Sequence, residues 1–106
     1  MKYIEDKYFI ALADHIKEIL EDKKIDVADL AAAANLDRRQ VYRLINKENV
    51  PKLSTLIRIS LAAGIEPQQL FALKFDFGAY MSENKILKVS KKKEKIILMR
   101  FRIISL

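Results

Sequence analysis

The run of residues 26–46, DVADLAAAANLDRRQVYRLIN, constrains the fold of this chain more than any other segment. Its first part places apolar residues at the i, i+3, i+4 and i+7 positions of one helical face: Val27, Leu30, Ala31 and Ala34. Asn35 follows where that helix must end, and asparagine tolerates the left-handed conformation that helix ends require. Asp26 and Asp37 are suitable N-caps for helices on either side of this turn. The run therefore predicts two short helices joined by a tight turn.

The second helix of this pair, residues 38–46, is predicted to have one apolar face and one basic face. Its buried stripe consists of three apolar residues: Val41, Leu44 and Ile45. Gln40 lies at the position from which its side chain completes a capping box with Asp37. The other side chains fall largely off the apolar stripe: Arg38, Arg39, Tyr42 and Arg43. They are available to a partner, and arginine pairs bidentately with guanine and with phosphate.

Apolar periodicity predicts three further helices within residues 1–74. One spans residues 7–22. Another spans residues 53–63 and ends at Gly64, with these residues expected to face inward: Leu53, Leu56, Ile57 and Ser60 or Leu61. The last begins at Pro67, which suits the first position of a helix. Five short helices with short links predict a compact all-α domain over residues 1–74.

The basic surplus of the chain lies in its C-terminal extension, residues 75–106. The net charge is +6, yet residues 1–82 contain 12 Lys and Arg against 12 Asp and Glu. Residues 83–106 contain 8 basic and 2 acidic residues, so the helical body is neutral. Two segments rich in β-branched residues, KILKVS and KIILMRFRIISL, predict a β-hairpin with a basic tip at SKKKE. Three roles stay open for the extension: solvated chain, a hairpin that enlarges a dimer interface, or an arm that contacts phosphates.

Composition excludes most kinds of enzyme and metal site. The chain has no cysteine, and its single histidine, His15, cannot build a metal site unaided. It also has no Ser/His/Asp arrangement, glycine-rich phosphate loop or HExxH motif. We therefore expect no catalytic activity, no cofactor and no metal. No apolar run approaches the roughly 20 residues of a membrane span, and the first residues do not resemble a signal peptide, which favours a cytoplasmic protein.

Residues 16–71 resemble the lambda-repressor-like, Cro/C1-type helix-turn-helix family, also called the XRE family. The resemblance rests on two stretches, IKEILEDKKIDVADLAAAANLDRRQVYRLIN and VPKLSTLIRISLAAGIEPQQLF. The order of the helices, the loop that ends in Pro51, the LAAGI segment and the PQQLF opening of the last helix all fit. The resemblance implies a five-helix, lambda-repressor-like domain that binds double-stranded DNA, in a bacterial or phage-encoded regulator associated with the nucleoid.

The resemblance also implies a role for each part of the helix-turn-helix. The helix that begins near Val27 crosses the DNA backbone, and residues 38–46 lie in the major groove. Three side chains are expected to face the bases: Arg38, Arg39 and Arg43. Three others are expected near phosphates or the edge of the groove: Asp37, Gln40 and Tyr42. The residues that resemble the phosphate-contacting loop are Asn46, Lys47 and Asn49.

Three positions depart from the pattern of the family. Val27 stands where a glutamine commonly clamps a phosphate, and this removes one anchoring hydrogen bond. Asn35 replaces the usual glycine of the turn. Ile45, Asn46 and Lys47 replace the Glu-Asn-Gly that often ends the recognition helix. Because of Val27, an adaptor that has lost DNA binding stays open as an alternative.

These features together predict a transcriptional regulator that acts as a homodimer on a pseudo-palindromic site. Repression by occupancy is expected, because a short protein needs no activation surface to block a promoter. Four aromatic residues in or just after the last helix suit either the edge of the core or a subunit interface: Phe71, Phe75, Phe77 and Tyr80. The alternative from another class is an antitoxin-type or adaptor protein whose C-terminal extension binds a small protein partner, with residues 96–99 and 103–106 as a partner strand.

Overall fold

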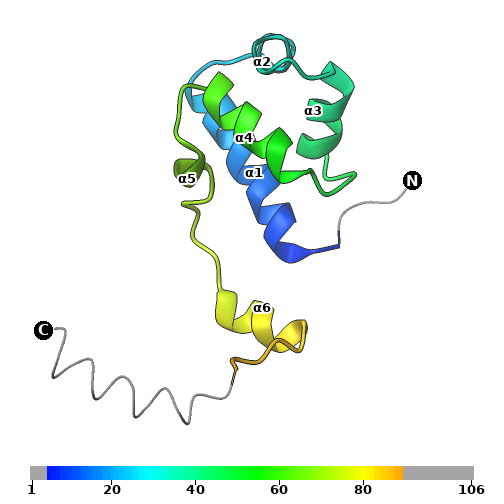
Figure 1. Cartoon of the computed structure of the whole chain (residues 1–106), viewed down its shortest axis with the longest axis vertical. Helices are drawn as coiled ribbons and strands as arrows, with labels where there is room; N and C mark the ends of the chain where they lie inside the picture. The colour runs from blue at the N-terminus through cyan, green and yellow to red at the C-terminus, as the bar shows by residue number, and fades with distance from the viewer. Residues whose placement is uncertain (1–4, 90–106) are drawn as a thin grey trace, which may run out of the picture. The chain divides into compact units, whose positions relative to one another are not determined.

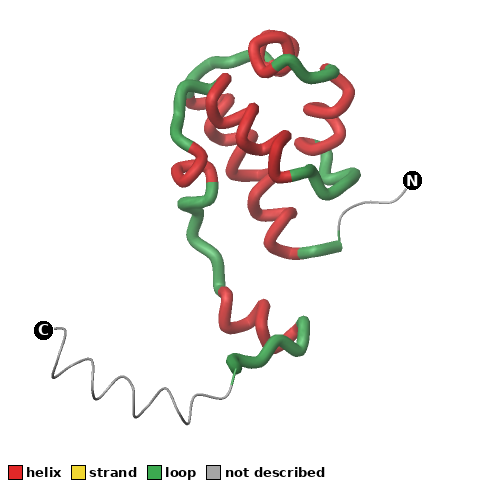
Figure 2. Tube along the Cα trace, in the orientation of Figure 1, coloured by secondary structure: helices red, strands yellow, loops and turns green. Residues whose placement is uncertain are grey.

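The structure, a computed structural model of the 106-residue chain, describes residues 5–89. These residues form six helices and no strand (Figure 1, Figure 2): α1 Lys7–Asp22, α2 Val27–Ala34, α3 Arg38–Ile45, α4 Leu53–Ala62, α5 Pro67–Leu70 and α6 Phe77–Glu83. The predicted all-α fold class is therefore confirmed. By its internal contacts the chain divides into two units, residues 1–76 with α1–α5 and residues 77–106 with α6.

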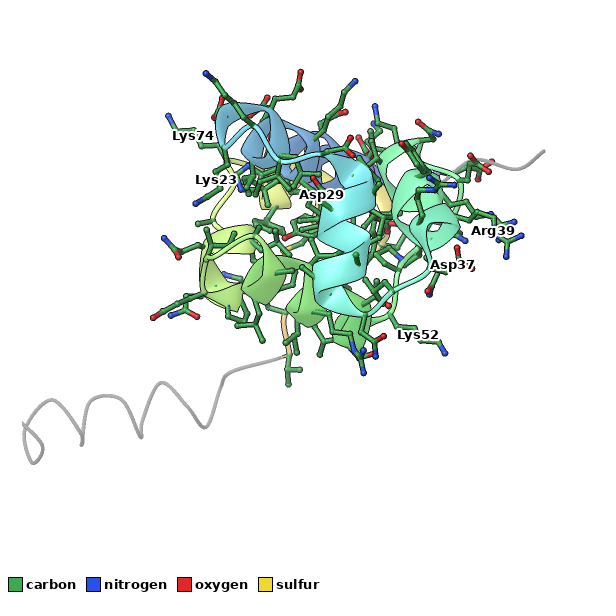
Figure 3. All side chains as sticks on the ribbon, turned by 90° about the horizontal axis from the view of Figure 1, so that it is seen from above. Lys23, Asp29, Asp37, Arg39, Lys52 and Lys74 are labelled. Carbon is green, nitrogen blue, oxygen red and sulfur yellow. The ribbon has the colours of Figure 1, made fainter. Side chains whose placement is uncertain are left out.

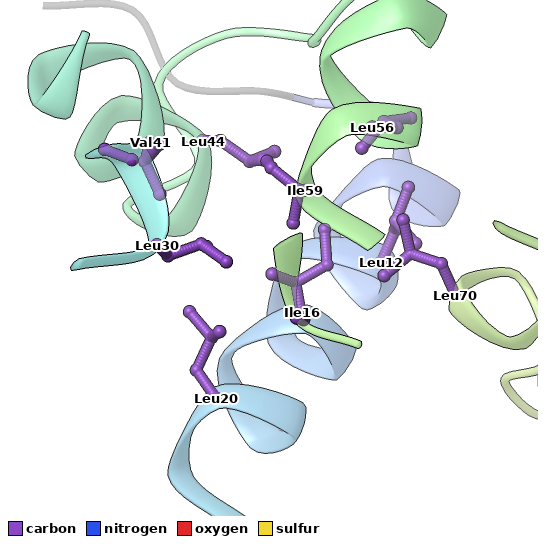
Figure 4. Packing of buried hydrophobic residues seen from close by; sticks show 11 residues of the cluster. Leu12, Ile16, Leu20, Leu30, Val41, Leu44, Leu56, Ile59 and Leu70 are labelled. Atoms are coloured by element: carbon purple, nitrogen blue, oxygen red, sulfur yellow. The ribbon is translucent and has the colours of Figure 1, made fainter. Parts of the chain in front are cut away.

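The core of the first unit is built around α1. Three buried side chains of α1, Leu12, Ile16 and Leu20, meet the apolar faces of the other helices (Figure 4). The buried residues that complete the cluster come from α2 onward: Leu30, Ala31, Val41, Leu44, Leu56, Ile59, Ala63 and Leu70. Each large apolar side chain buried in this way contributes about 1.5–3 kcal/mol. Because α2 packs against both α3 and α4, the helix-turn-helix is part of this core rather than an appendage to it.

The turn between α2 and α3 has the left-handed residue that the sequence predicts. Asn35 has φ 56° and ψ 48°, and its N–H donates to the carbonyl of Ala32 at 3.2 Å. Leu36 N–H donates to the carbonyl of Ala31 at 2.9 Å, which completes a Schellman ending. Four other helices end in the same way, with these left-handed residues: Lys24, Lys47, Gly64 and Lys85. Most of these endings lack glycine, so they carry backbone strain.

The buried face of α4 matches the predicted one only in part. Leu56 and Ser60 are buried as predicted, but the other two buried residues are Thr55 and Ile59. Leu53, Ile57 and Leu61 instead remain 63%, 36% and 61% exposed. Apolar residues occur on both faces of α4, so periodicity alone does not choose between them. Ser60 can occupy the buried face because its hydroxyl donates to the Ile57 carbonyl at 2.7 Å, which offsets the cost of burying it.

The extension contains a helix that the sequence analysis did not predict. α6 is seven residues long, buries none of its side chains and is followed by the left-handed Lys85. Asn84 Nδ2 donates to the Tyr80 carbonyl at 2.9 Å, which caps the end of the helix locally. Periodicity missed α6 because so short a helix cannot display a repeated apolar stripe. Residues 86–89, near the start of the predicted hairpin, form no strand, and from residue 90 that hairpin lies outside the described residues.

Candidate nucleic-acid interface

α3 separates its buried from its exposed side chains. Val41 and Leu44 are 0% and 1% exposed and lie in the core. The side chains of α3 that were predicted to meet DNA are all exposed: Arg38, Arg39, Gln40, Tyr42 and Arg43. Asn46, which directly follows the helix, is exposed as well. The structure therefore brings these predicted residues to the outer surface of one short helix that contains three arginines and no acidic residue.

A residue outside the motif holds the turn that precedes α3. Arg58 on α4 directs Nη1 to the carbonyls of Ala34 and Asn35, at 3.5 Å and 3.4 Å. These carbonyls belong to the C-terminal end of α2, where the helix dipole favours a cation. This role of Arg58 could not be predicted from the sequence, because its partners are more than 20 residues away along the chain.

The N-cap of α3 engages one of the three arginines. Asp37 Oδ1 accepts from the Arg39 N–H at 2.8 Å, and its carboxylate also accepts from Arg39 Nε at 3.4 Å and Nη2 at 3.1 Å. The side-chain hydrogen bond from Arg39 is the main reason that the pKa of Asp37 is lowered, and the pKa of Arg39 is raised in turn. The capping-box prediction for Gln40 is therefore wrong, because the side chain that pairs with Asp37 is that of Arg39. Within the described part of the chain, Arg38 and Arg43 have no ion-pair partner.

An ion pair ties the loop after α3 to α1. Lys47 Nζ lies 2.8 Å from Asp14 Oδ1, and the two side chains are 35% and 54% exposed. Lys47 was predicted to contact phosphate, yet in the free protein it already has an acidic partner. Pairs this exposed contribute about 0–1 kcal/mol, so exchanging Asp14 for a phosphate costs little.

A hollow of about 530 Å³ lies where α1, α2 and α3 meet. Its polar lining consists of two lysines, two acidic residues and two of the predicted site residues: Lys17, Lys24, Glu21, Asp26, Tyr42 and Asn46. Val27 lines it too, next to Asp26, which occupies the N-cap position of α2 as predicted but makes no side-chain capping hydrogen bond. The first N–H groups of α2 therefore keep their capacity to donate to an anion. Lys17 and Lys24 were not predicted as site residues, because nothing in their spacing distinguishes them from other surface lysines.

Residues 5–89 contain neither a metal-binding cluster nor a membrane-spanning helix. No group of three His, Cys, Asp or Glu side chains in this range could hold a metal ion. The Nε2 atom of His15 is buried and has no hydrogen-bond partner. None of the helices formed by these residues is long and apolar enough to cross a membrane.

The fold and the basic surface define a helix-turn-helix protein, in which α2 and α3 are joined by a left-handed turn and α3 presents exposed arginines. The family model described as "Cro/C1-type HTH DNA-binding domain" matches residues 15–76, more than half of the chain. The chain therefore belongs to the Cro/C1-type helix-turn-helix family and contains a DNA-binding domain of that type. Searches of the curated proteins and of the solved structures found no match.

Proposed function

We propose that this protein is a sequence-specific transcriptional regulator that binds double-stranded DNA as a homodimer and represses by occupancy. In this proposal residues 1–74 form the DNA-binding domain, and α3 enters the major groove. The observation that carries it is the exposed pair Arg38 and Arg43, on a helix whose other face is anchored in the core by Val41 and Leu44. A helix held in this way presents its side chains to base edges in a fixed orientation.

The three arginines of α3 take different roles in this proposal. Arg38 and Arg43, which have no ion-pair partner among the described residues, read base edges. Arginine favours guanine O6 and N7, and each bidentate pair contributes roughly 1–3 kcal/mol of discrimination. Arg39 stays with Asp37 and presents a neutral pair to the edge of the groove.

The hollow beside α2 supplies the phosphate anchor that Val27 cannot provide. Lys17 and Lys24 line it together with Glu21 and Asp26, and the first turn of α2, which has no side-chain cap, adds donors and the positive end of a helix dipole. Such contacts position the protein on DNA without reading sequence. The remaining residues proposed to contact phosphates or the edge of the groove are Gln40, Tyr42, Asn46 and Lys47.

Selection of binding sites from a random duplex library tests the proposal, followed by affinity measurements on Arg38→Ala and Arg43→Ala. We expect a pseudo-palindromic motif and a loss of about 5- to 150-fold for each variant on the selected site. Lys74→Ala is the matched control, because it also removes one positive charge but lies on the opposite side of the domain from Arg39 (Figure 3). Failure to enrich any motif, with equal losses in all three variants, would contradict sequence-specific binding.

A second candidate function is binding of a small protein partner through the extension, as in an antitoxin or an adaptor. The residues after α6 favour it, because Ile86, Leu87 and Val89 are 45%, 87% and 78% exposed. Exposed apolar side chains in chain without regular structure suit a partner that pairs with them as a strand. Co-purification with a second small protein, abolished by Leu87→Ser without loss of DNA affinity, would support this function.

A further inference from the structure

α4 carries a second apolar row that the core does not use. Leu53, Ile57 and Leu61 follow one another at four-residue spacing and are 63%, 36% and 61% exposed. The other exposed side chains of α4 are Ser54 and Arg58. Residues at this spacing form a continuous ridge on a helix, and contiguous exposed apolar side chains mark contact sites. We call Leu53, Ile57 and Leu61 the α4 ridge.

The α4 ridge is symmetric about its central residue. Ile57 has a leucine four residues before it and another four residues after it. A two-fold axis near Ile57 therefore brings Leu53 of each copy to Leu61 of the partner subunit, and Ile57 to its own equivalent. This is the self-complementarity that an isologous contact requires. Ridges of this type interdigitate when two helices cross at about −50°.

The charges around the α4 ridge also fit a second copy in antiparallel orientation. Residues 49–65 contain no acidic residue, and their two basic residues are Lys52 and Arg58. Lys52 lies at the N-terminal end of α4, and the last turn of the helix has no basic residue. Antiparallel pairing separates the two Lys52 side chains and brings each one toward the carbonyl end of the partner helix, where a cation is favourable. The guanidinium of Arg58 keeps its charge, but it is directed to the carbonyls of the α2–α3 turn.

We propose that the α4 ridge is the homodimer contact of this protein, occupied by the α4 ridge of a second copy with Ile57 near the two-fold axis. This inference rests on the proposed homodimer and names its surface, in place of the aromatic residues around and after α5 that the sequence suggested. Lys52, next to the ridge, lies on the same side of the domain as Asp37 and Arg39 (Figure 3). Binding to one duplex requires in addition that this contact leaves both α3 helices on a common side of the dimer.

Cysteine cross-linking reports the contact directly, since the chain contains no cysteine of its own. In Ile57→Cys the two thiols meet near the axis, and a disulfide forms readily when two Cα atoms come within about 7 Å. We expect mild oxidation at micromolar concentration to convert most of the Ile57→Cys protein into a covalent dimer. Leu87→Cys is the control, because Leu87 is 87% exposed and lies outside the ridge. Equally slow cross-linking of both variants would overturn the inference.

A charge swap tests the symmetry of the contact independently. Ile57→Lys and Ile57→Glu each place two like charges near the axis, and we expect each variant alone to dimerise at least about 100-fold more weakly by sedimentation equilibrium. An equimolar mixture should restore a dimer with one copy of each variant. If the mixture stays monomeric although both variants melt like the wild type by circular dichroism, the isologous contact is wrong. A wild-type chain that is monomeric at all concentrations would also overturn it and leave the ridge to a different protein.

Two combined variants separate this inference from the proposed DNA binding. Ile57→Cys/Arg43→Ala should cross-link as completely as Ile57→Cys, even where its DNA affinity is lost. Ile57→Lys should bind a single half-site with an affinity within about twofold of the wild type, because Ile57 and the α3 side chains act independently. The variant should not gain affinity when a second half-site is added, because that gain requires a dimer. Cross-linking without DNA binding would refute the proposed function and leave the α4 contact intact. DNA binding that depends on Arg43, without cross-linking at position 57, would refute the α4 contact and leave the proposed function intact.

Discussion

α3 and α4 are consecutive helices that are both anchored in the core, but the surfaces that they present to solvent differ in chemical character. Each buries one face in the same core, α3 through Val41 and Leu44, and α4 through Leu56 and Ile59. The outer surface of α3 is basic, with three arginines, whereas that of α4 carries the apolar α4 ridge. The core therefore orients both helices, and the residues left outside decide what each can meet. A basic surface suits a polyanion, and an uncharged ridge suits another apolar surface.

The largest expected effect concerns the two faces of α4. Ile59→Ala removes a side chain that is 1% exposed, and it should lower the free energy of unfolding by about 2–5 kcal/mol through lost burial and a cavity. Leu61→Ala removes one that is 61% exposed, and it should change that free energy by less than about 0.5 kcal/mol. Urea denaturation of both variants at a concentration where the protein is monomeric measures the difference. Equal losses would mean that the ridge is buried within one chain and is not free to meet a second copy.

On α3, Arg43→Lys separates charge from geometry. Lysine keeps the positive charge but cannot form the planar bidentate pair with guanine. We expect a loss of roughly 1–3 kcal/mol of discrimination at one position of each half-site, with an unchanged salt dependence of binding. Fluorescence anisotropy on the selected site and on its single-base variants, at two salt concentrations, measures both quantities. If discrimination survives the substitution, Arg43 contacts a phosphate and not a base.

The endings of the two helices differ in one residue type. α4 ends at Gly64 with φ 79°, whereas α3 ends at Lys47 with φ 63°. Gly64→Ala should destabilise the fold by about 1–2 kcal/mol through backbone strain alone, because apart from residue 64 and its two chain neighbours no heavy atom lies within 4 Å of the added Cβ. Lys47→Gly relieves similar backbone strain, but it also removes the ion pair with Asp14, which contributes about 0–1 kcal/mol. We therefore expect the free energy of unfolding to stay the same or to rise slightly. Thermal melts of both variants test this, with Lys24→Gly as the left-handed control that breaks no ion pair to a described residue.

A smaller effect is expected from Asp37→Asn, which makes Arg39 as available as the other two arginines of α3. Asparagine is an equally good N-cap, so α3 should be retained. Arg39 can then contact a phosphate, and the slope of log affinity against log salt should steepen by about 0.9. Asp29→Asn is the matched control, because it removes the same charge from α2 without releasing an arginine. Identical slopes for the two variants would mean that Arg39 already leaves Asp37 when DNA binds.

The smallest effect is the pH dependence of the Asp37–Arg39 pair. The pKa of Asp37 is lowered in the folded protein, chiefly by the hydrogen bond from the Arg39 side chain. The pair therefore contributes stability above the ordinary aspartate pKa of about 3.9, and this contribution is lost as the pH falls through the lower folded value. The stability difference between the wild type and Asp37→Asn should be constant near neutral pH and vanish only in strongly acidic solution. Chemical denaturation between pH 7 and pH 2 measures it, and a difference that vanishes above pH 5 would contradict the pairing.

The helices of the first unit were predictable because their causes lie within a few residues of one another. α1 to α5 begin at the predicted residues, and the left-handed Asn35 and Gly64 are confirmed. α5 is shorter than its apolar residues suggested, since the helix ends at Leu70. α6 was missed because seven residues that bury none of their side chains leave no apolar stripe in the sequence.

The candidate site was only partly predictable. The exposed side of α3 followed from periodicity, because Val41 and Leu44 determine which way the helix faces. The ion pair between Lys47 and Asp14 joins positions far apart in the chain, so no local sequence pattern predicts it. The pairing of Arg39 with Asp37 is local, but it depends on which of several side-chain conformations the arginine adopts.

The sequence by itself determined the order of the helices, the turn between α2 and α3 and the three arginines beyond that turn, because capping, chain reversal and periodicity are short-range effects. Only the tertiary structure decided which face of α4 is buried. Both faces are apolar, and the choice depends on how the side chains of α1, α2 and α5 fill one core together. The same packing brought Arg58 to the end of α2 and gathered Lys17 and Lys24 beside α3. These contacts join residues that are distant in the chain, and such contacts form only when the core closes.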